Sequence, residues 1–473
     1  MQKRYISFGL FVAIALLTGC ADNSTESVDS SIVFEPCEGI SEIECGSFEV
    51  PLIHNSTDNR KISIAVARLP GTGAGPHEPL LLNEGGPGSG TETLREFFQS
   101  GLIPEEIRER YDIIGFDQRG VGNPLRVDCD HLGNAMPTKY SRDQNDIIAL
   151  VAESTALADA CSAEYSDQLQ WVGSNAVVRD LDVLRMMLQA PKLNIIGTSF
   201  GTRISALYLE RFPETSGRII LDAPLPPTGN IDSILIESAA AQQSSFDLIL
   251  NACGTTLPDC DPAAIEATFV ARINALLDVN DLDTFKAFFN LLSLGIEESD
   301  VGELLAPLLI DYAISGDPTD MFLLIQDFGL DQDDDDNDRV TLERAVLCAD
   351  DPDRPDVESL LTTLGSLNDA SDLFAEAVLP LAASCVGWPE ALEPVVDIRA
   401  TDVPRSLVIG GTEDVRTPII WAAETADAIG GVLVASDHQG HTTVFAREND
   451  CIDSLVIEFL LEGTLPPEGT NCI

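Results

Sequence analysis

The sequence predicts an α/β protein whose mostly parallel sheet, flanked by helices, is interrupted by a large helical insertion. Short β-branched or apolar runs alternate with helical patterns in the first half of the chain and again near its end. Between Asp222 and about Pro394 this alternation stops, and apolar residues recur at three- and four-residue spacing, which is typical of helices. A GxSxG motif between an apolar run and an amphipathic segment supports the same class, since that turn joins a strand to a helix.

The first twenty residues are predicted to be an export signal. Lys3 and Arg4 form a basic start, and residues 6–17 are an apolar run too short to span a bilayer. The following LTGC resembles the bacterial lipobox, so Cys20 is the expected site of lipidation and the new N-terminus; an ordinary signal peptide is the alternative. We therefore expect an exported protein anchored by lipid to the bacterial envelope, at the outer membrane, facing the periplasm or the cell surface.

The remaining chain divides by pattern into a tether, a core in two parts, and a cap. The polar residues 21–31 are expected to be flexible. The first part of the core spans 32–225, the helical cap 226–395 and the second part of the core 396–473. Seven strands are predicted, at Ile64–Leu69, Pro79–Leu82, Ile113–Phe116, Leu193–Ile196, Ile219–Leu221, Leu407–Ile409 and Val432–Val434.

The composition excludes some functions. The chain has 27 basic and 78 acidic side chains, a formal net charge of −51. Such a surface repels phosphate backbones and anionic headgroups, so neither nucleic-acid binding nor membrane binding through basic patches is expected. Residues 226–395 contain 34 of the acidic and five of the basic residues, so more than half of the negative charge lies on the predicted cap. Salt adaptation predicts no such bias, whereas attraction of a cationic substrate amine does.

The cysteines favour an oxidising compartment. Of the eleven, ten remain once Cys20 is set aside, an even number. Their spacing suggests the pairs Cys37–Cys45, Cys129–Cys161, Cys253–Cys260, Cys348–Cys385 and Cys451–Cys472, although the sequence leaves the connectivity open. No metal site or other cofactor is expected, since no CxxC or clustered Cys/His spacing occurs. The run DQDDDDND at 331–338 is expected to be a solvated loop, because Asp336 and Leu342 stand where a calcium loop needs Gly and Glu.

Ser199 is the predicted nucleophile. It lies in GTSFG at 197–201, after the apolar run LNII and before TRISALYLERFP. The turn between strand and helix is so tight that small residues are needed on both sides of the serine. The hydroxyl is then presented at a helix N-terminus, where the dipole favours developing negative charge.

A glycine-rich loop, NEGGPGSG at 83–90, is the predicted oxyanion loop. Glycines let backbone N–H groups approach the oxyanion, and Gly86 and Phe200 are the predicted donors. A phosphate-binding loop is the rival, but the segment lacks a GK[ST] ending.

The expected order of a catalytic triad, Ser then Asp then His, can be completed. Asp414 follows the strand-like SLVIGG and is the predicted acid, with Glu413 as its alternative. Of the five histidines, two follow Ser199; His441 is preferred over His438 as the base, because Gly440 beside it permits the loop to reach back. Asp222 also ends a strand but directly follows the nucleophile unit, so a structural role is expected for it.

The motifs together resemble a known family. The GGPG loop, DQRG at 117–120, GTSFG, and the C-terminal segments GGTEDVRTP and QGHT are similar to the proline iminopeptidase and tripeptidyl aminopeptidase group of α/β-hydrolases, with a TAP-like C-terminal region. In this sequence Glu84 stands where His precedes GGPG in proline iminopeptidases, and Thr442 follows His441 where Gly is usual.

The resemblance implies an α/β-hydrolase fold and a serine exopeptidase acting on N-terminal residues or short N-terminal peptides that enter beneath the cap. Glu84 is a candidate for substrate binding. A carboxylesterase or lipase on the same triad and a non-catalytic peptide-binding lipoprotein are the alternatives. Arg119 of the DQRG turn is expected to brace the active-site loops, whereas Trp171, Trp388 and the phenylalanines of the cap are expected to be core residues.

Overall fold

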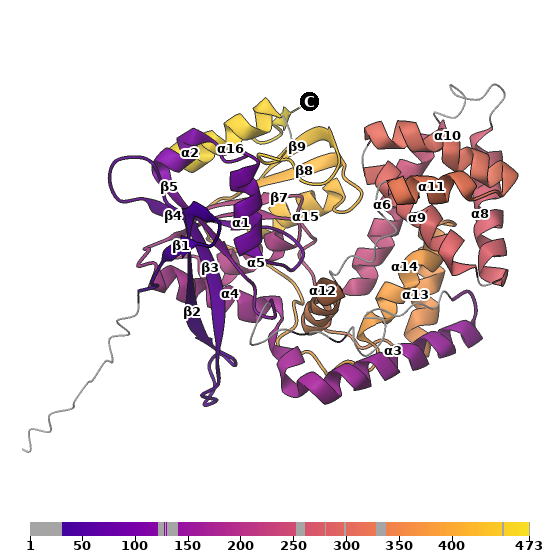
Figure 1. The fold of residues 1–473 in the computed structure, drawn as a ribbon, viewed down its shortest axis with the longest axis horizontal. Coiled ribbons are helices and arrows are strands. Elements are labelled where there is room, and N and C mark those ends of the chain that lie inside the picture. Colours follow the sequence, from indigo (N-terminus) through magenta and orange to yellow (C-terminus); the bar gives the residue numbers. More distant parts are fainter. Residues whose placement is uncertain are drawn as a thin grey trace, which may run out of the picture. The chain divides into compact units, whose positions relative to one another are not determined.

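One mixed sheet is built from the first and last parts of the chain (Figure 1). The computed structural model describes residues 31–446 and 449–472, apart from 122–126, 128, 130–140, 252–260, 280, 298 and 328–336. Within these residues the strand order is β1-β2-β3-β5-β4-β6-β7-β8-β9-β10. The strands are β1 (Glu35–Cys37), β2 (Ile40–Pro51), β3 (Lys61–Leu69), β4 (Glu78–Asn83), β5 (Tyr111–Phe116), β6 (Leu193–Thr198), β7 (Ser216–Asp222), β8 (Leu407–Glu413), β9 (Val432–Gln439) and β10 (Asn471–Cys472).

The sheet is parallel where it carries the predicted site. Strands β5, β4, β6, β7, β8, β9 and β10 pair parallel, whereas β1, β2, β3 and β5 pair antiparallel. Parallel strands are covered on both faces and are therefore apolar on both faces, as in β6, which is buried along its whole length. The predicted α/β class and all seven predicted strands are confirmed. Strands β1, β2 and β10 were missed, because β2 mixes glutamates with its apolar residues and β10 has two residues.

Helices cover both faces of the sheet. The core helices are α1 (Gly90–Gln99), α2 (Glu105–Arg110), α4 (Ser174–Met187), α5 (Phe200–Arg211), α15 (Ile419–Ile429) and α16 (Asp450–Glu462). Val177 of α4 and Ile204 of α5 belong to one buried apolar cluster, and Leu94 of α1 and Ile452 of α16 belong to another. Successive side chains of each strand point to opposite faces of the sheet and pack in one cluster or the other, so the sheet lies between two layers of helices.

The predicted insertion is helical. After β7 the chain forms α6 (Ile231–Asn251), α8 (Pro262–Val279), α9 (Leu282–Glu297), α10 (Ser299–Ser315), α11 (Thr319–Asp327), α12 (Asn337–Asp350), α13 (Val357–Ala370), α14 (Ala375–Ala382) and the 3₁₀ turn η3 (Ala383–Cys385) before returning to β8. Edge-on and tilted aromatic contacts among Phe246, Phe269, Phe288 and Phe374 lie in its interior. These phenylalanines and Trp388 are buried, as predicted, whereas Trp171 is only partly buried and Phe322 of the cap is 41% exposed, contrary to the prediction.

The helix α3 (Gln144–Tyr165), which lies between β5 and α4 in the chain, packs against α13 (Figure 1). The 3₁₀ turn η2 (Ser166–Trp171) follows it.

The cap contacts the core through Asp350, the last residue of α12. The Asp350 carboxylate accepts hydrogen bonds from the Ser174 backbone N–H (2.8 Å) and pairs with Arg203 of α5 at 3.5 Å. Within the described ranges, none of the helices combines the length and apolarity that a membrane crossing requires.

Four of the five suggested disulfides are formed. They join Cys37 to Cys45, Cys129 to Cys161, Cys348 to Cys385, and Cys451 to Cys472. The suggested pair Cys253–Cys260, the acidic residues 331–336 and the predicted lipidation site Cys20 lie outside the described residues.

Candidate active site

Ser199 lies at the turn between β6 and α5, as predicted. Its φ of 52° and ψ of −125° are unusual for a residue with a side chain, and such backbone strain persists where the surrounding structure enforces it. The turn is enforced by close packing: a Cβ on Gly201 would lie 1.8 Å from the carbonyl oxygen of Asn83. The Ser199 N–H donates to the Asp222 carbonyl at 3.0 Å, which ties the turn to the end of β7.

The glycine-rich loop lies directly against the nucleophile. A Cβ on Gly85 would lie 2.7 Å from Ser199 Cβ, 3.0 Å from Ser199 Oγ and 3.4 Å from Phe200 N, so the contact requires glycine. The loop is therefore placed where its backbone can reach an oxyanion formed on Ser199. Gly85 is the glycine of the loop in contact with Ser199, and the predicted donor Gly86 follows it with a φ of 114°. Phe200 is the first residue of α5.

Asp414 and His441 are brought together from different strands. The carboxylate Oδ2 of Asp414, after β8, lies 2.9 Å from His441 Nδ1, after β9. Asp414 is 4% exposed, and it is held by the N–H groups of Arg416 and Thr417 (both 2.9 Å) and by the Thr417 hydroxyl (2.7 Å). This pairing assigns Nδ1 as the proton donor to the carboxylate, which leaves Nε2 as the nitrogen that can accept a proton.

The structure pairs His441 with Asp414, not with the alternative acid Glu413. The side chain of His438, the alternative base, lies outside the described residues. Thr417, which sequence reasoning missed, follows Asp414 by three residues, the spacing at which an aspartate accepts N–H bonds from its own turn. That spacing could have identified it.

The loop that carries His441 is anchored to the sheet by Asp222. The Asp222 Oδ2 accepts the N–H groups of Thr443 (2.7 Å) and Val444 (2.8 Å). Burial raises the pKa of Asp222 to about 6, partly offset by these two hydrogen bonds and by the nearby His441. Thr442 has a φ of 63°, a conformation that glycine adopts readily and that β-branched residues rarely adopt.

The DQRG turn contributes a different residue from the one predicted. Arg119 is 2% exposed and donates to both oxygens of Asp180 (2.7 Å each) and to the carbonyls of Leu52 and Trp171. It therefore braces β2, α4 and η2, and the prediction that Arg119 braces the active-site loops is wrong.

Asp117 of the same turn holds the glycine-rich loop. Its Oδ1 accepts from the Ser89 hydroxyl (2.8 Å) and from the N–H and hydroxyl of Thr91 (3.1 and 2.8 Å). The sequence prediction therefore named the correct turn but the wrong side chain, since Asp117 and not Arg119 contacts the glycine-rich loop.

A small pocket lies beside the nucleophile turn. It is lined by Leu82, Asn83, Glu84, Thr93, Phe97, Ile196, Thr198, Val444 and Phe445. These residues come from the ends of β4 and β6, from α1 and from the loop after His441. The pocket therefore adjoins the nucleophile turn, the glycine-rich loop and the loop that carries His441. Glu84 is exposed, and its carboxylate accepts the Thr93 hydroxyl at 2.6 Å.

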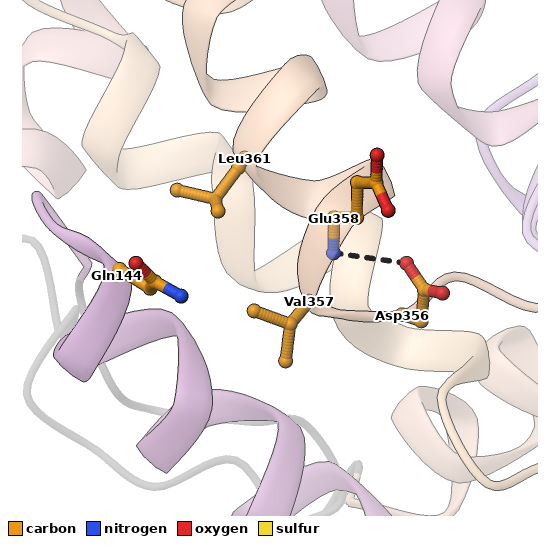
Figure 2. Close-up of a pocket in the computed structure, with 5 residues that line it drawn as sticks. All are labelled: Gln144, Asp356, Val357, Glu358 and Leu361. Atoms are coloured by element: carbon orange, nitrogen blue, oxygen red, sulfur yellow. Dashed lines mark hydrogen bonds between the residues drawn. The ribbon is translucent and has the colours of Figure 1, made fainter.

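A second, more open pocket lies between the starts of α3 and α13 (Figure 2). Gln144, Asp356, Val357, Glu358 and Leu361 line it, and none of them is a predicted site residue. The Asp356 carboxylate accepts the N–H of Glu358 at 2.9 Å and so serves as the cap of α13. Within the part of the chain that the structure describes, no group of three or more His, Cys, Asp or Glu side chains is placed to hold a metal ion.

A serine on a strand-to-helix turn, an aspartate–histidine pair and a glycine loop against the serine, all at the carboxyl ends of parallel strands, define a serine hydrolase of the α/β-hydrolase fold. The family comparisons agree. Residues 78–258 match the α/β hydrolase fold family, and residues 371–472 match the family of TAP-like proteins. The chain accordingly has the α/β-hydrolase fold, with similarity to TAP-like proteins over residues 371–472.

Two relatives are similar over most of the chain, and a third is similar over less than half of it. "Serine protease Hip1" of Mycobacterium tuberculosis is 27% identical over 460 residues, which cover 90% of this chain and 87% of that protein. "Carboxylesterase B" of the same species is 26% identical over 457 residues, 90% of this chain and 86% of that protein. "Tripeptidyl aminopeptidase" of Streptomyces lividans is 28% identical over 212 residues, 43% of this chain and 39% of that protein.

Among solved structures, the proline iminopeptidase of Mycobacterium smegmatis has a TM-score of 0.38 and 15% identity, covering 88% of this chain and 97% of that one.

Proposed function

We propose that this serine hydrolase is an exopeptidase that removes N-terminal residues or short N-terminal peptides through an acyl-enzyme. The observation that carries the proposal is the Asp414–His441 pair at 2.9 Å, on a loop that Asp222 joins to the strained Ser199 turn. Ser199 Oγ attacks the peptide carbonyl while His441 Nε2 takes its proton and then gives it to the leaving amine. Asp414 holds the ring and stabilises the imidazolium, and water, activated by the same histidine, releases the acyl group.

The N–H groups of Gly86 and Phe200 are the proposed oxyanion donors. Phe200 N stands at the start of α5, where the helix dipole favours a negative charge, and the Gly85 contact brings the loop to the same atoms. Glu84, directly before Gly85, remains the candidate for contact with substrate.

Two kinds of support favour a peptidase acting on free N-termini. The serine protease relative aligns over nine-tenths of this chain, and a tripeptidyl aminopeptidase aligns over 212 residues of it. In addition, residues 226–395 carry 34 acidic and five basic side chains. Such a charge attracts a cationic α-amine electrostatically.

A carboxylesterase is the second candidate, since the relative called carboxylesterase B aligns over an equal share of the chain. A substrate panel separates the two: free-amine tripeptidyl and prolyl anilides, the same anilides with blocked N-termini, and short acyl esters. We expect turnover of the free-amine anilides by the wild type and none by Ser199→Ala. Turnover of esters alone would refute the peptidase proposal. A non-catalytic peptide binder would leave Ser199 unlabelled by a fluorophosphonate.

The charge argument has its own test. Replacing exposed cap carboxylates by amides should raise KM for free-amine substrates and leave KM for blocked ones unchanged. An unchanged KM for both free-amine and blocked substrates would indicate that the acidic residues of the cap serve solubility alone.

We also propose that the mature protein is anchored to the bacterial envelope through a lipid on Cys20, facing the periplasm or the cell surface from the outer membrane. The support is the LTGC sequence after a basic and then apolar segment. Metabolic labelling with a fatty-acid probe should mark the wild type and spare Cys20→Ala. Equal labelling of both would contradict the anchor.

A further inference from the structure

Asp222 connects the two parts of the site that exchange a proton. Its backbone carbonyl accepts the Ser199 N–H at 3.0 Å. Its carboxylate accepts the N–H groups of Thr443 and Val444, two and three residues after His441, at 2.7 and 2.8 Å. One buried residue at the end of β7 therefore fixes the nucleophile turn from one side and the histidine loop from the other.

The histidine loop needs such an anchor. Thr442 and Phe445, which flank the two bonded amides, both have positive φ, 63° and 57°. Residues with side chains hold this conformation only where surrounding contacts enforce it. The two hydrogen bonds to Asp222 lie between them and supply that constraint.

The negative charge of Asp222 is more than the anchor requires. Asp222 is 1% exposed. Burial, together with the nearby charge of Asp414, raises its pKa to about 6, against the opposing effects of the loop hydrogen bonds and of His441. Both N–H groups bond to a single oxygen, so an asparagine amide oxygen could accept them without a buried charge. A carboxylate kept at this cost in stability is expected to serve the reaction.

We propose that Asp222 is a positioning residue for the catalytic pair: it holds the Ser199 turn and the His441 loop in one frame, and its charge stabilises the imidazolium formed when His441 takes the Ser199 proton. The inference rests on the proposed function, since it assumes that Ser199 and His441 react together. No bond to Asp222 forms or breaks; the proton moves from Ser199 Oγ to His441 Nε2.

The rate of labelling by a fluorophosphonate, measured from pH 5 to pH 9, tests the inference independently of peptide specificity. In Asp222→Asn the loop keeps its acceptor but the charge is lost. We expect the plateau rate to fall about three- to tenfold and the acid limb to move to lower pH by about half a unit. The melting temperature at pH 8 should stay equal or rise. Asp222→Ala also loses the acceptor, and its rate should fall about a hundredfold.

Asp453→Asn is the matched control. Asp453 accepts the Phe445 N–H of the same loop at 3.0 Å, but its titration responds to Asp450 and not to His441. Its labelling rate should stay within about twofold of the wild type, with an unshifted acid limb. Wild-type rates and an unshifted limb in Asp222→Asn would overturn the charge role, and wild-type rates in Asp222→Ala would overturn the whole inference.

The proposed function fails in a different way. A wild type that is not labelled at Ser199 overturns the catalytic pair and this inference with it. A wild type that is labelled but hydrolyses no peptide overturns the peptidase proposal alone, and the Asp222 variants still decide the positioning role.

Discussion

The contact between Gly85 and the nucleophile makes Gly85→Ala the sharpest test of the active-site geometry. The added Cβ would lie 2.7 Å from Ser199 Cβ and 3.0 Å from Ser199 Oγ, whereas ordinary contacts begin at 3.4 Å. The loop or the serine must therefore move by about 0.7 Å. Since a misplacement of about 1 Å costs about a hundredfold in rate, we expect kcat and the fluorophosphonate labelling rate to fall about ten- to a hundredfold.

Gly88→Ala is the control within the same loop. Its added Cβ would lie 3.7 Å from the Gly85 carbonyl oxygen, an ordinary contact, so we expect activity within about twofold of the wild type. Both variants should show wild-type circular dichroism and similar melting temperatures, because the loop lies at the end of β4 and not in the core. Activity of Gly85→Ala within about threefold of the wild type would refute the proposed approach of the loop to Ser199.

Three further predictions follow from the structure. Burial raises the pKa of Asp222 and of Asp351 from 3.8 to about 6, so the folded state binds these protons more tightly than the unfolded state. Each group then contributes about 3 kcal/mol of stability that is fully present below about pH 4 and is lost as pH rises through about 6. The melting temperature should rise from pH 8 to pH 5, and a fall over that range would contradict the assignment. Thr442→Gly relieves a left-handed backbone at a β-branched residue and should stabilise the protein by up to about 1 kcal/mol in urea unfolding; a net loss would contradict the strain. Asp350→Ala leaves the buried Arg203 without the carboxylate 3.5 Å away and should cost about 3–5 kcal/mol, whereas a cost below about 1 kcal/mol would show that this pair does not hold the cap to α5.

Local sequence patterns were sufficient for seven of the ten strands of the described sheet, for the nucleophile turn and for the pairing of most cysteines. The apolar run before GTSFG had to be a strand and the segment after it a helix, because the motif permits few other arrangements. Cysteines close in the chain, such as Cys37 and Cys45, can pair because closing the short loop between them costs little conformational entropy. The order of Ser199, Asp414 and His441 also follows from the chain alone.

The contacts that make these residues a site were decided by the tertiary structure. Asp414 and His441 are 27 residues apart in the chain, and they meet because β8 and β9 are parallel neighbours whose carboxyl ends share one edge of the sheet. The same edge brings Asp222 under the histidine loop, and it brings Asp117 to the glycine-rich loop from the next strand in the sheet. Arg119 was misassigned because nothing in its own segment shows that its partner is Asp180, 61 residues away. Periodicity and motifs act over a few residues, so they determine the elements and the nucleophile, whereas the hydrogen bonds that position a reactive group depend on which strand ends the fold makes adjacent.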